Sequence, residues 1–346
     1  MPAPIRVGIL NDTGAPSSIG VDRWIRLVVD DLRQAGRLDR DVGLVQATCL
    51  GLPHGTAAAV ERAYQDLVDQ DVLLVVGPAI GDDALALTPM VERAEVPTIN
   101  WSGAERARGE HMFHLQVGSH EDESVVIARH LASRVWRVGV VVDRSPIGRR
   151  HLQFLEEEAA AVRLKVAATA MVDPLAESAD DEVQRLVEAD VDALVYLGLG
   201  HSAPAVVAAA AALGWDGPSI MNTAGMRGHS PDWAGRLDGW AYVDMYADDN
   251  RTLAAVRDRL GHHEAAPMPT AVGYDLGRLV GEGLARAPEL TRPGVRDGLE
   301  QIKWLPAAEG HEGTLLGFGI RDRGALHGRY LVLRCWQGST SVALGP

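Results

Sequence analysis

Short apolar segments alternate with amphipathic helical segments along most of this 346-residue chain, and this alternation limits its fold more than any other feature. The short segments are rich in Val, Ile and Leu on both faces, as in strands of a sheet that is covered on both sides. A repeated strand–helix–strand order predicts parallel sheets with right-handed crossovers. We expect strands at 5–10, 42–47, 72–76, 98–100, 137–142, 164–170, 193–197, 219–221 and 241–245. We expect helices at about 20–35, 56–70, 83–94, 120–134, 147–161, 179–189 and 203–213.

The alternation runs once up to about residue 115 and again from about 136 to 222. A chain of this length exceeds one comfortable hydrophobic core, so we expect an α/β protein with two Rossmann-like lobes, each built on a parallel sheet. The remainder of the chain departs from the pattern. It predicts helices near 251–261, 270–287 and 293–301. An antiparallel pair, Gly313–Ile320 with Arg329–Trp336, should follow, with its turn at Asp322-Arg323-Gly324.

The composition and the missing motifs exclude several classes of function. A formal net charge of −14 repels polyanions, so we expect no nucleic acid and no anionic membrane as partner. Gly198-x-Gly200-x-x-Ala203 is a weak dinucleotide fingerprint, because Asn222 stands where an acidic residue is needed. No metal-ligand spacing and no catalytic nucleophile pattern is present, so we expect no cofactor, no metal and no enzyme.

The first residues show neither a basic segment nor the apolar run of a signal peptide. We therefore expect a cytoplasmic protein, or an extracytoplasmic one whose export signal has been removed.

Ligands of open α/β sheets bind beyond the carboxyl ends of the strands. Six loops follow predicted strands and are rich in Gly, Ser and Asp: 11–20, 77–83, 101–104, 143–148, 198–202 and 222–225. Three come from each half, so we expect them to face one another across a cleft. In the second loop, Asp82 and Asp83 are either cleft carboxylates or a helix cap with a first-turn acid. In the third, Trp101 is either a platform for a ligand or a lid over the edge of the core.

These loops resemble those of type I periplasmic binding proteins of the branched-chain amino-acid (Leu/Ile/Val) receptor family, which serve ABC importers. The resemblance covers nearly the whole chain and rests on the order of several loose motifs: Val7-Gly8-Ile9-Leu10, Val76-Gly77-Pro78, Val96-Pro97-Thr98-Ile99-Asn100, Ser102-Gly103-Ala104, Val138–Asp143 with Gly148, Asp192–Tyr196 and Leu213-Gly214-Trp215.

The resemblance implies two lobes, three interlobe crossings and a cleft that closes on a ligand. One lobe would comprise residues 1–117 plus 247–322, and the other 118–246 plus 323–346. The crossings would lie near Val117-Gly118, Met245-Tyr246 and Asp322–Gly324.

Departures from the family pattern concern the ligand. Amino-acid binders of the family hold the ligand carboxylate with a Ser or Thr, and the resemblance places Asp82 or Asp83 of this sequence at that position. They hold the ligand amine with an acidic residue, and the resemblance places Ala224 at that position. Their aromatic clamps match Ile19 and Ile147. The resemblance therefore implies a ligand other than a standard α-amino acid: an apolar or aromatic compound, an amide or an amine. The expected ligand-binding residues are Ser18, Ile19, Gly81, Asp82, Asp83, Trp101, Ser102, Gly103, Ala104, Ile147, His201, Thr223, Ala224 and Tyr274.

Three functions compete at this point. The chain is the substrate-binding component of an ABC importer, or a cytoplasmic ligand sensor of the amide-sensing type on the same fold, or an enzyme on a doubly wound fold. The expected partners are a small-molecule ligand and either an ABC permease or a regulatory protein. Fold alone does not choose among these functions, because function depends on the site.

Overall fold

The computed structural model describes residues 3–14, 19–261 and 266–344. The chain divides into two compact units. The first contains residues 1–117 and 245–330, and the second contains 118–244 and 331–346. Residues 323–330 therefore belong to the first unit, where the sequence analysis placed them in the second, and the last crossing falls between Tyr330 and Leu331. No helix in the described part of the chain is long and apolar enough to cross a membrane.

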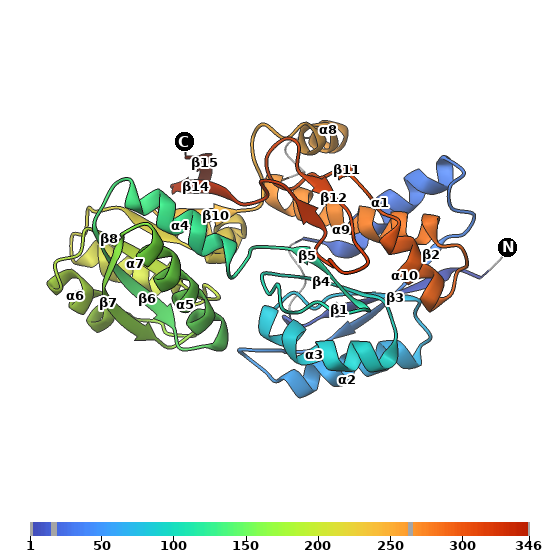
Figure 1. Ribbon diagram of the computed structural model, residues 1–346, viewed down its shortest axis with the longest axis horizontal. Helices are drawn as coiled ribbons and strands as arrows, with labels where there is room; N and C mark the ends of the chain where they lie inside the picture. The colour runs from blue at the N-terminus through green and yellow to red at the C-terminus, as the bar shows by residue number, and fades with distance from the viewer. Residues whose placement is uncertain (1–2, 15–18, 262–265, 345–346) are drawn as a thin grey trace. The chain divides into compact units, whose positions relative to one another are not determined.

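The first unit is built on a parallel sheet with helices on both faces (Figure 1). Its strands, in the spatial order β2-β1-β3-β4-β5, are β1 (Ile5–Asn11), β2 (Val42–Thr48), β3 (Leu74–Val76), β4 (Thr98–Ser102) and β5 (Met112–Gln116). Its helices are α1 (Val21–Gln34), α2 (Ala57–Asp69), α3 (Gly81–Ala94), α8 (Arg251–Leu260), α9 (Pro267–Arg286) and α10 (Arg292–Glu300). Helices α2 and α3 cover one face, while α1, α9 and α10 lie on the other.

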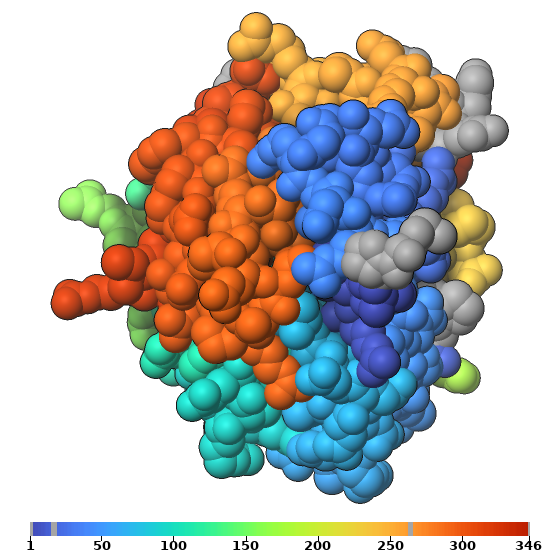
Figure 2. Space-filling view, turned by 90° about the vertical axis from the view of Figure 1, so that its right-hand side faces the viewer, coloured from blue at the N-terminus to red at the C-terminus, as the bar shows by residue number. Residues whose placement is uncertain are grey.

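A row of glycines lets α9 pack tightly on α1. Gly273, Gly277 and Gly281 are four residues apart and therefore lie on one face of α9. A side chain at Gly273 would meet the indole ring of Trp24, and one at Gly277 would lie 2.6 Å from the Trp24 carbonyl oxygen. On the surface of this unit, the N-terminal segment (blue) and the later helical segment (orange) lie side by side (Figure 2). Segments some 250 residues apart in sequence thus make one layer.

The second unit has a sheet of seven strands in the order β15-β14-β10-β9-β8-β6-β7. Five are parallel: β6 (Arg137–Asp143), β7 (Lys165–Val172), β8 (Ala193–Leu197), β9 (Ser219–Met221) and β10 (Ala241–Asp244). Beside them run the antiparallel strands β14 (Val332–Gln337) and β15 (Thr340–Ala343). The helical segments are α4 (Asp122–Ala132), α5 (Pro146–Ala161), α6 (Asp180–Glu188), α7 (Ala203–Ala212), η1 (Thr223–His229) and η2 (Pro231–Trp233).

Side chains alternate across this second sheet as the pleat requires. Val138, Val140 and Val142 of β6 pack in one core cluster with α4 and α5. Gly139 points the other way, where a Cβ would meet Leu186 of α6 at 3.2 Å. Both faces are therefore covered, which explains the nearly continuous apolar strands in the sequence.

The predicted antiparallel pair of Gly313–Ile320 with Arg329–Trp336 is wrong. The first segment contributes β12 (Leu315–Leu316), which pairs with β11 (Leu305–Pro306) and β13 (Leu326–His327) in a small sheet of the first unit. The second contributes β14, which pairs with β10 in the second unit. The chain between them therefore does turn back, but it joins β12 to β13, with Gly319 donating its N–H to the Asp322 carbonyl at 2.7 Å, and not to Arg329–Trp336.

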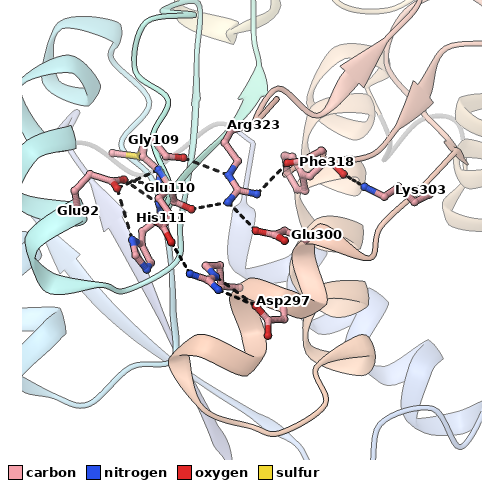
Figure 3. Close-up of polar contacts among 12 residues, drawn as sticks. Glu92, Gly109, Glu110, His111, Asp297, Glu300, Lys303, Phe318 and Arg323 are labelled. Atoms are coloured by element: carbon pink, nitrogen blue, oxygen red, sulfur yellow. Dashed lines mark hydrogen bonds and ion pairs between the residues drawn. The ribbon is translucent and has the colours of Figure 1, made fainter. Parts of the chain in front are cut away.

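Arg323 is an anchor rather than a turn residue. His114 donates its backbone N–H to the Arg323 carbonyl at 2.9 Å, so this segment continues the sheet beside β5. The side chain of Arg323 is 4 % exposed, and its guanidinium group is fully engaged by neighbours. It donates to the carboxylate of Glu300 at 2.7 Å and to the carbonyls of Gly109 and Glu110 (Figure 3). It also lies 4.6 Å from the ring centre of Phe113, so it fastens the last part of the first unit to its sheet.

Candidate functional site

Two buried carboxyl groups, Asp12 and Asp83, join three loops at the carboxyl edge of the first unit's sheet. Asp12 follows β1 and accepts hydrogen bonds from the backbone N–H groups of Ala79 and Ile80, at 3.0 and 2.9 Å. Asp83, in the first turn of α3, accepts from the N–H of Leu52 after β2. The two side chains also influence each other's pKa. The loops after β1, β2 and β3 are therefore fixed by one polar cluster.

Burial dominates the electrostatics of this cluster. Burial first, and the nearby charge of Asp12 second, raise the pKa of Asp83 to about 7, against the lowering effect of the hydrogen bond from Leu52. Burial also raises the pKa of Asp12, against the backbone N–H groups that lower it. Asp83 is fully buried, whereas Asp82 is partly exposed beside the buried Gly81 at the start of α3. Of the two predicted carboxylates, only Asp82 is thus open to solvent.

Trp101 lies near the end of β4 and is partly exposed, as a residue at the rim of a sheet would be. The neighbouring Ser102 is buried, donates its hydroxyl to the Asn100 side chain at 2.9 Å and accepts from the N–H of Ala104 at 3.3 Å. Ala104 is itself buried, while Gly103 between them is partly exposed. Of the backbone N–H groups predicted to point at a ligand, that of Ala104 is therefore already bonded within the loop.

His114 of β5 is hydrogen-bonded to the end of β4. Arg108 donates its Nε–H to His114 Nδ1 at 3.0 Å, so Nε2 carries the ring proton and donates it to the Ser102 carbonyl at 2.6 Å. Burial lowers the pKa of His114 to about 3, so the ring stays neutral. A neutral histidine of fixed tautomer thus positions the loop that carries Trp101.

Ile19 and Tyr274 both contact Trp24. The indole N–H of Trp24 donates to the Ile19 carbonyl at 2.7 Å, and the rings of Trp24 and Tyr274 meet edge to face at 6.4 Å. Ile19 is buried, and Tyr274 of α9 is half-buried beneath the guanidinium of Arg278. Ser18, also predicted to contact the ligand, lies outside the described residues.

The second unit carries its own polar cluster at the carboxyl edge of its sheet, centred on Asp143. This fully buried carboxylate, at the end of β6, accepts from the hydroxyls of Tyr196 and Ser202 at 2.8 and 2.7 Å and from the N–H of Leu199 at 2.7 Å. Burial raises the pKa of Asp143, and these hydrogen bonds and the charge of Arg227 oppose that rise. The cluster fixes the loop after β8 in the way that Asp12 fixes the loops of the first unit.

Arg227, in η1, determines which ring nitrogen of His201 carries the proton. Its Nη2 lies 2.8 Å from His201 Nε2, and because guanidinium has no acceptor, this Nε2 carries no proton. Arg227 also donates to the Leu199 carbonyl at 2.6 Å and lies over the ring of Trp233. The predicted site residue His201 is therefore held in one tautomer next to a cation.

Glu123, in the first turn of α4, holds the loop after β9. It is fully buried and accepts from the N–H of Thr223 at 2.7 Å, from the Thr223 hydroxyl at 3.1 Å and from the N–H of Ser119 at 2.6 Å. Ala224 beside Thr223 is 5 % exposed, and Ile147 at the start of α5 is 3 % exposed. Both side chains are therefore buried, and both donor groups of Thr223 point to Glu123.

The dinucleotide fingerprint has a structural role in this protein. The Asn222 amide accepts from the N–H of Gly198 and donates to the Gly198 carbonyl, at 3.3 and 3.0 Å. It ties β9 to the loop after β8 and takes the place of the acidic residue that would hold a ribose. In the described part of the chain, no group of three His, Cys, Asp or Glu residues is arranged to hold a metal ion.

Sequence reasoning found the loops but missed several residues that organise them. Asp12 and Asp143 were visible as polar residues directly after strands, which was a usable signal. Glu123 had only the weak signal of an acidic residue in the first turn of a predicted helix. Arg227 and Tyr196 had none, because their partners come from loops distant in sequence.

The two α/β units, each with a parallel sheet and polar loops at its carboxyl edge, define a class of ligand-binding proteins. A family model described as periplasmic binding protein matches residues 4–334, and the chain belongs to this family. The family match confirms the prediction of a binding protein rather than an enzyme. No curated sequence matches the chain significantly.

Solved structures agree on the type I fold. A type 1 periplasmic binding protein from Bordetella pertussis superposes with a TM-score of 0.82 at 17% identity, covering 99% of this chain and 100% of that one. A leucine-binding protein from Thermotoga maritima gives 0.80 at 14% identity, covering 99% and 98%. An ABC transporter substrate-binding protein from Desulfitobacterium hafniense in complex with Leu gives 0.79 at 16% identity, covering 99% and 100%. At such identities the likeness concerns the fold.

Proposed function

We propose that this protein is the substrate-binding component of an ABC importer and binds a small organic ligand with loops from both units. The family match over residues 4–334 carries this proposal. The polar clusters of Asp12 and Asp143 support it, because they fix the loops at the edge where parallel sheets bind ligands. Binding between the two units would shift an equilibrium between open and closed arrangements.

The ligand is proposed to be an apolar or aromatic compound, an amide or an amine, and not a standard α-amino acid. The observation that supports this is Ala224, at the position where the resemblance implies an acidic partner for the ligand amine. The nearby carboxylate of Glu123 already accepts from three donors. At the other end, the partly exposed carboxylate of Asp82 would repel a ligand carboxylate. A zwitterionic amino acid would therefore meet like charge without compensation.

Native mass spectrometry of the purified protein tests this proposal directly. A co-purified neutral or cationic molecule, released on denaturation, is the expected result. Leucine, isoleucine or valine as the released molecule would contradict the proposed ligand class. Small-angle scattering with the identified compound then tests closure: the radius of gyration should decrease at saturation, and an unchanged radius would contradict the proposed closure.

A further inference from the structure

Glu123 connects two segments that are about 100 residues apart in sequence. Ser119, whose backbone N–H it accepts, lies two residues after the boundary between the units at Val117 and Gly118. Thr223, whose N–H and hydroxyl it accepts, opens the candidate ligand loop after β9. One carboxylate thus holds the start of the second unit and the start of a ligand loop at the same time.

The surroundings of Glu123 are built for this contact. Gly118 has a φ of +85°, and a Cβ there would lie 2.5 Å from Glu123 Oε1 and 2.8 Å from Thr223 Oγ1. Only a glycine lets the backbone approach both groups in this conformation. Because Glu123 is fully buried, its charge depends on these donors, and a buried carboxylate without them would be costly.

The same loop is tied down at its other end. His229, the last residue of η1, has its Nε2 2.8 Å from Asp244 Oδ2, and Asp244 is the last residue of the second unit before the chain enters the first again. The hydroxyl of Tyr242 donates to the same oxygen at 2.6 Å. Both ends of η1 are therefore bonded to residues at or near the points where the chain passes between units.

We infer that Glu123 is a positioning residue that couples the ligand loop at Thr223 to the crossing segment Gly118–Ser119. This inference rests on the proposed function insofar as the loop binds ligand, whereas the coupling itself is a property of the unliganded protein. A simple helix cap would hold Ser119 alone. A coupling residue does more: a change at Thr223 alters the protection of the Ser119 amide from exchange, and a change at Ser119 alters that of Thr223.

Amide hydrogen exchange in the unliganded protein tests the coupling. In Glu123→Gln the amide cannot accept at both oxygens, so exchange at Ser119 and Thr223 should rise at least tenfold. Thr223→Val removes only the hydroxyl donor and keeps the side-chain shape. It should raise exchange at Ser119 several-fold, although it leaves the Ser119 hydrogen bond in place. Glu121→Gln changes an exposed carboxylate on the same helical turn and should alter neither amide.

Binding of phenylacetamide, a neutral aromatic amide, tests the consequence for ligand. Glu123→Gln should weaken it at least tenfold, with Glu121→Gln unchanged. Unchanged exchange at Ser119 in Thr223→Val would overturn the coupling and leave Glu123 a helix cap. Faster exchange with unchanged phenylacetamide affinity would overturn the positioning role. If the unmodified protein does not bind phenylacetamide, the proposed ligand class loses support, while the exchange results still decide the coupling.

Discussion

Asp12 and Asp83 are both almost completely buried, at 1 % and 0 % exposure, and together their side chains hold the loops after β1, β2 and β3. Burial and the nearby charge of Asp12 raise the pKa of Asp83. Asp83 therefore keeps its proton at pH values where exposed carboxyl groups have lost theirs.

This proton makes stability depend on pH. The pKa of Asp83 rises from 3.8 to about 7 on folding, so the folded state binds the proton more tightly than the unfolded state. Its contribution is fully present below about pH 4 and is lost as pH rises through 7. Between pH 5 and 8 the unmodified protein should therefore lose about 1–2 kcal/mol more than Asp83→Asn, measured by urea unfolding. Asp22→Asn, an exposed acid in the first turn of α1, is the control. An identical pH dependence in Asp83→Asn would contradict the raised pKa of Asp83.

Trp101 is expected to contact the ligand, because it is partly exposed at the carboxyl edge of the first sheet. Trp101→Ala should weaken phenylacetamide binding by roughly 1–3 kcal/mol and leave the melting temperature nearly unchanged. The matched control is Trp136→Ala, which removes a tryptophan that is 60% exposed just before β6. A lower melting temperature with unchanged affinity would show that Trp101 belongs to the core.

Arg323 should be essential for stability. Arg323→Ala leaves the carboxylate of Glu300 without its closest cation and frees the carbonyls of Gly109 and Glu110, so unfolding should become easier by about 2–4 kcal/mol. Arg321→Ala, two residues earlier and exposed, should stay within about 0.5 kcal/mol of the unmodified protein. Equal effects of the two changes in urea unfolding would contradict the anchoring role.

The α/β fold could be predicted from sequence because each parallel strand is a short apolar segment that can be recognised locally, as Val138–Val142 can. The pairing of the last strands could not be predicted in this way. Val332–Gln337 was expected to pair with Gly313–Ile320, yet its partners are β10, about 90 residues earlier, and β15, which follows it. The candidate site shows the same division: loops after strands were predictable, whereas the donors that surround Glu123 and Asp143 come from distant loops.

Isothermal titration with leucine, isoleucine and valine, beside phenylacetamide, tests the proposed ligand class most directly. Because Ala224 offers no acid for an amine and the partly exposed Asp82 opposes a carboxylate, the three amino acids should bind more weakly than about 1 mM, that is, with less than about 4 kcal/mol of binding free energy. Phenylacetamide should bind far more tightly. Micromolar binding of leucine would contradict this account of the site.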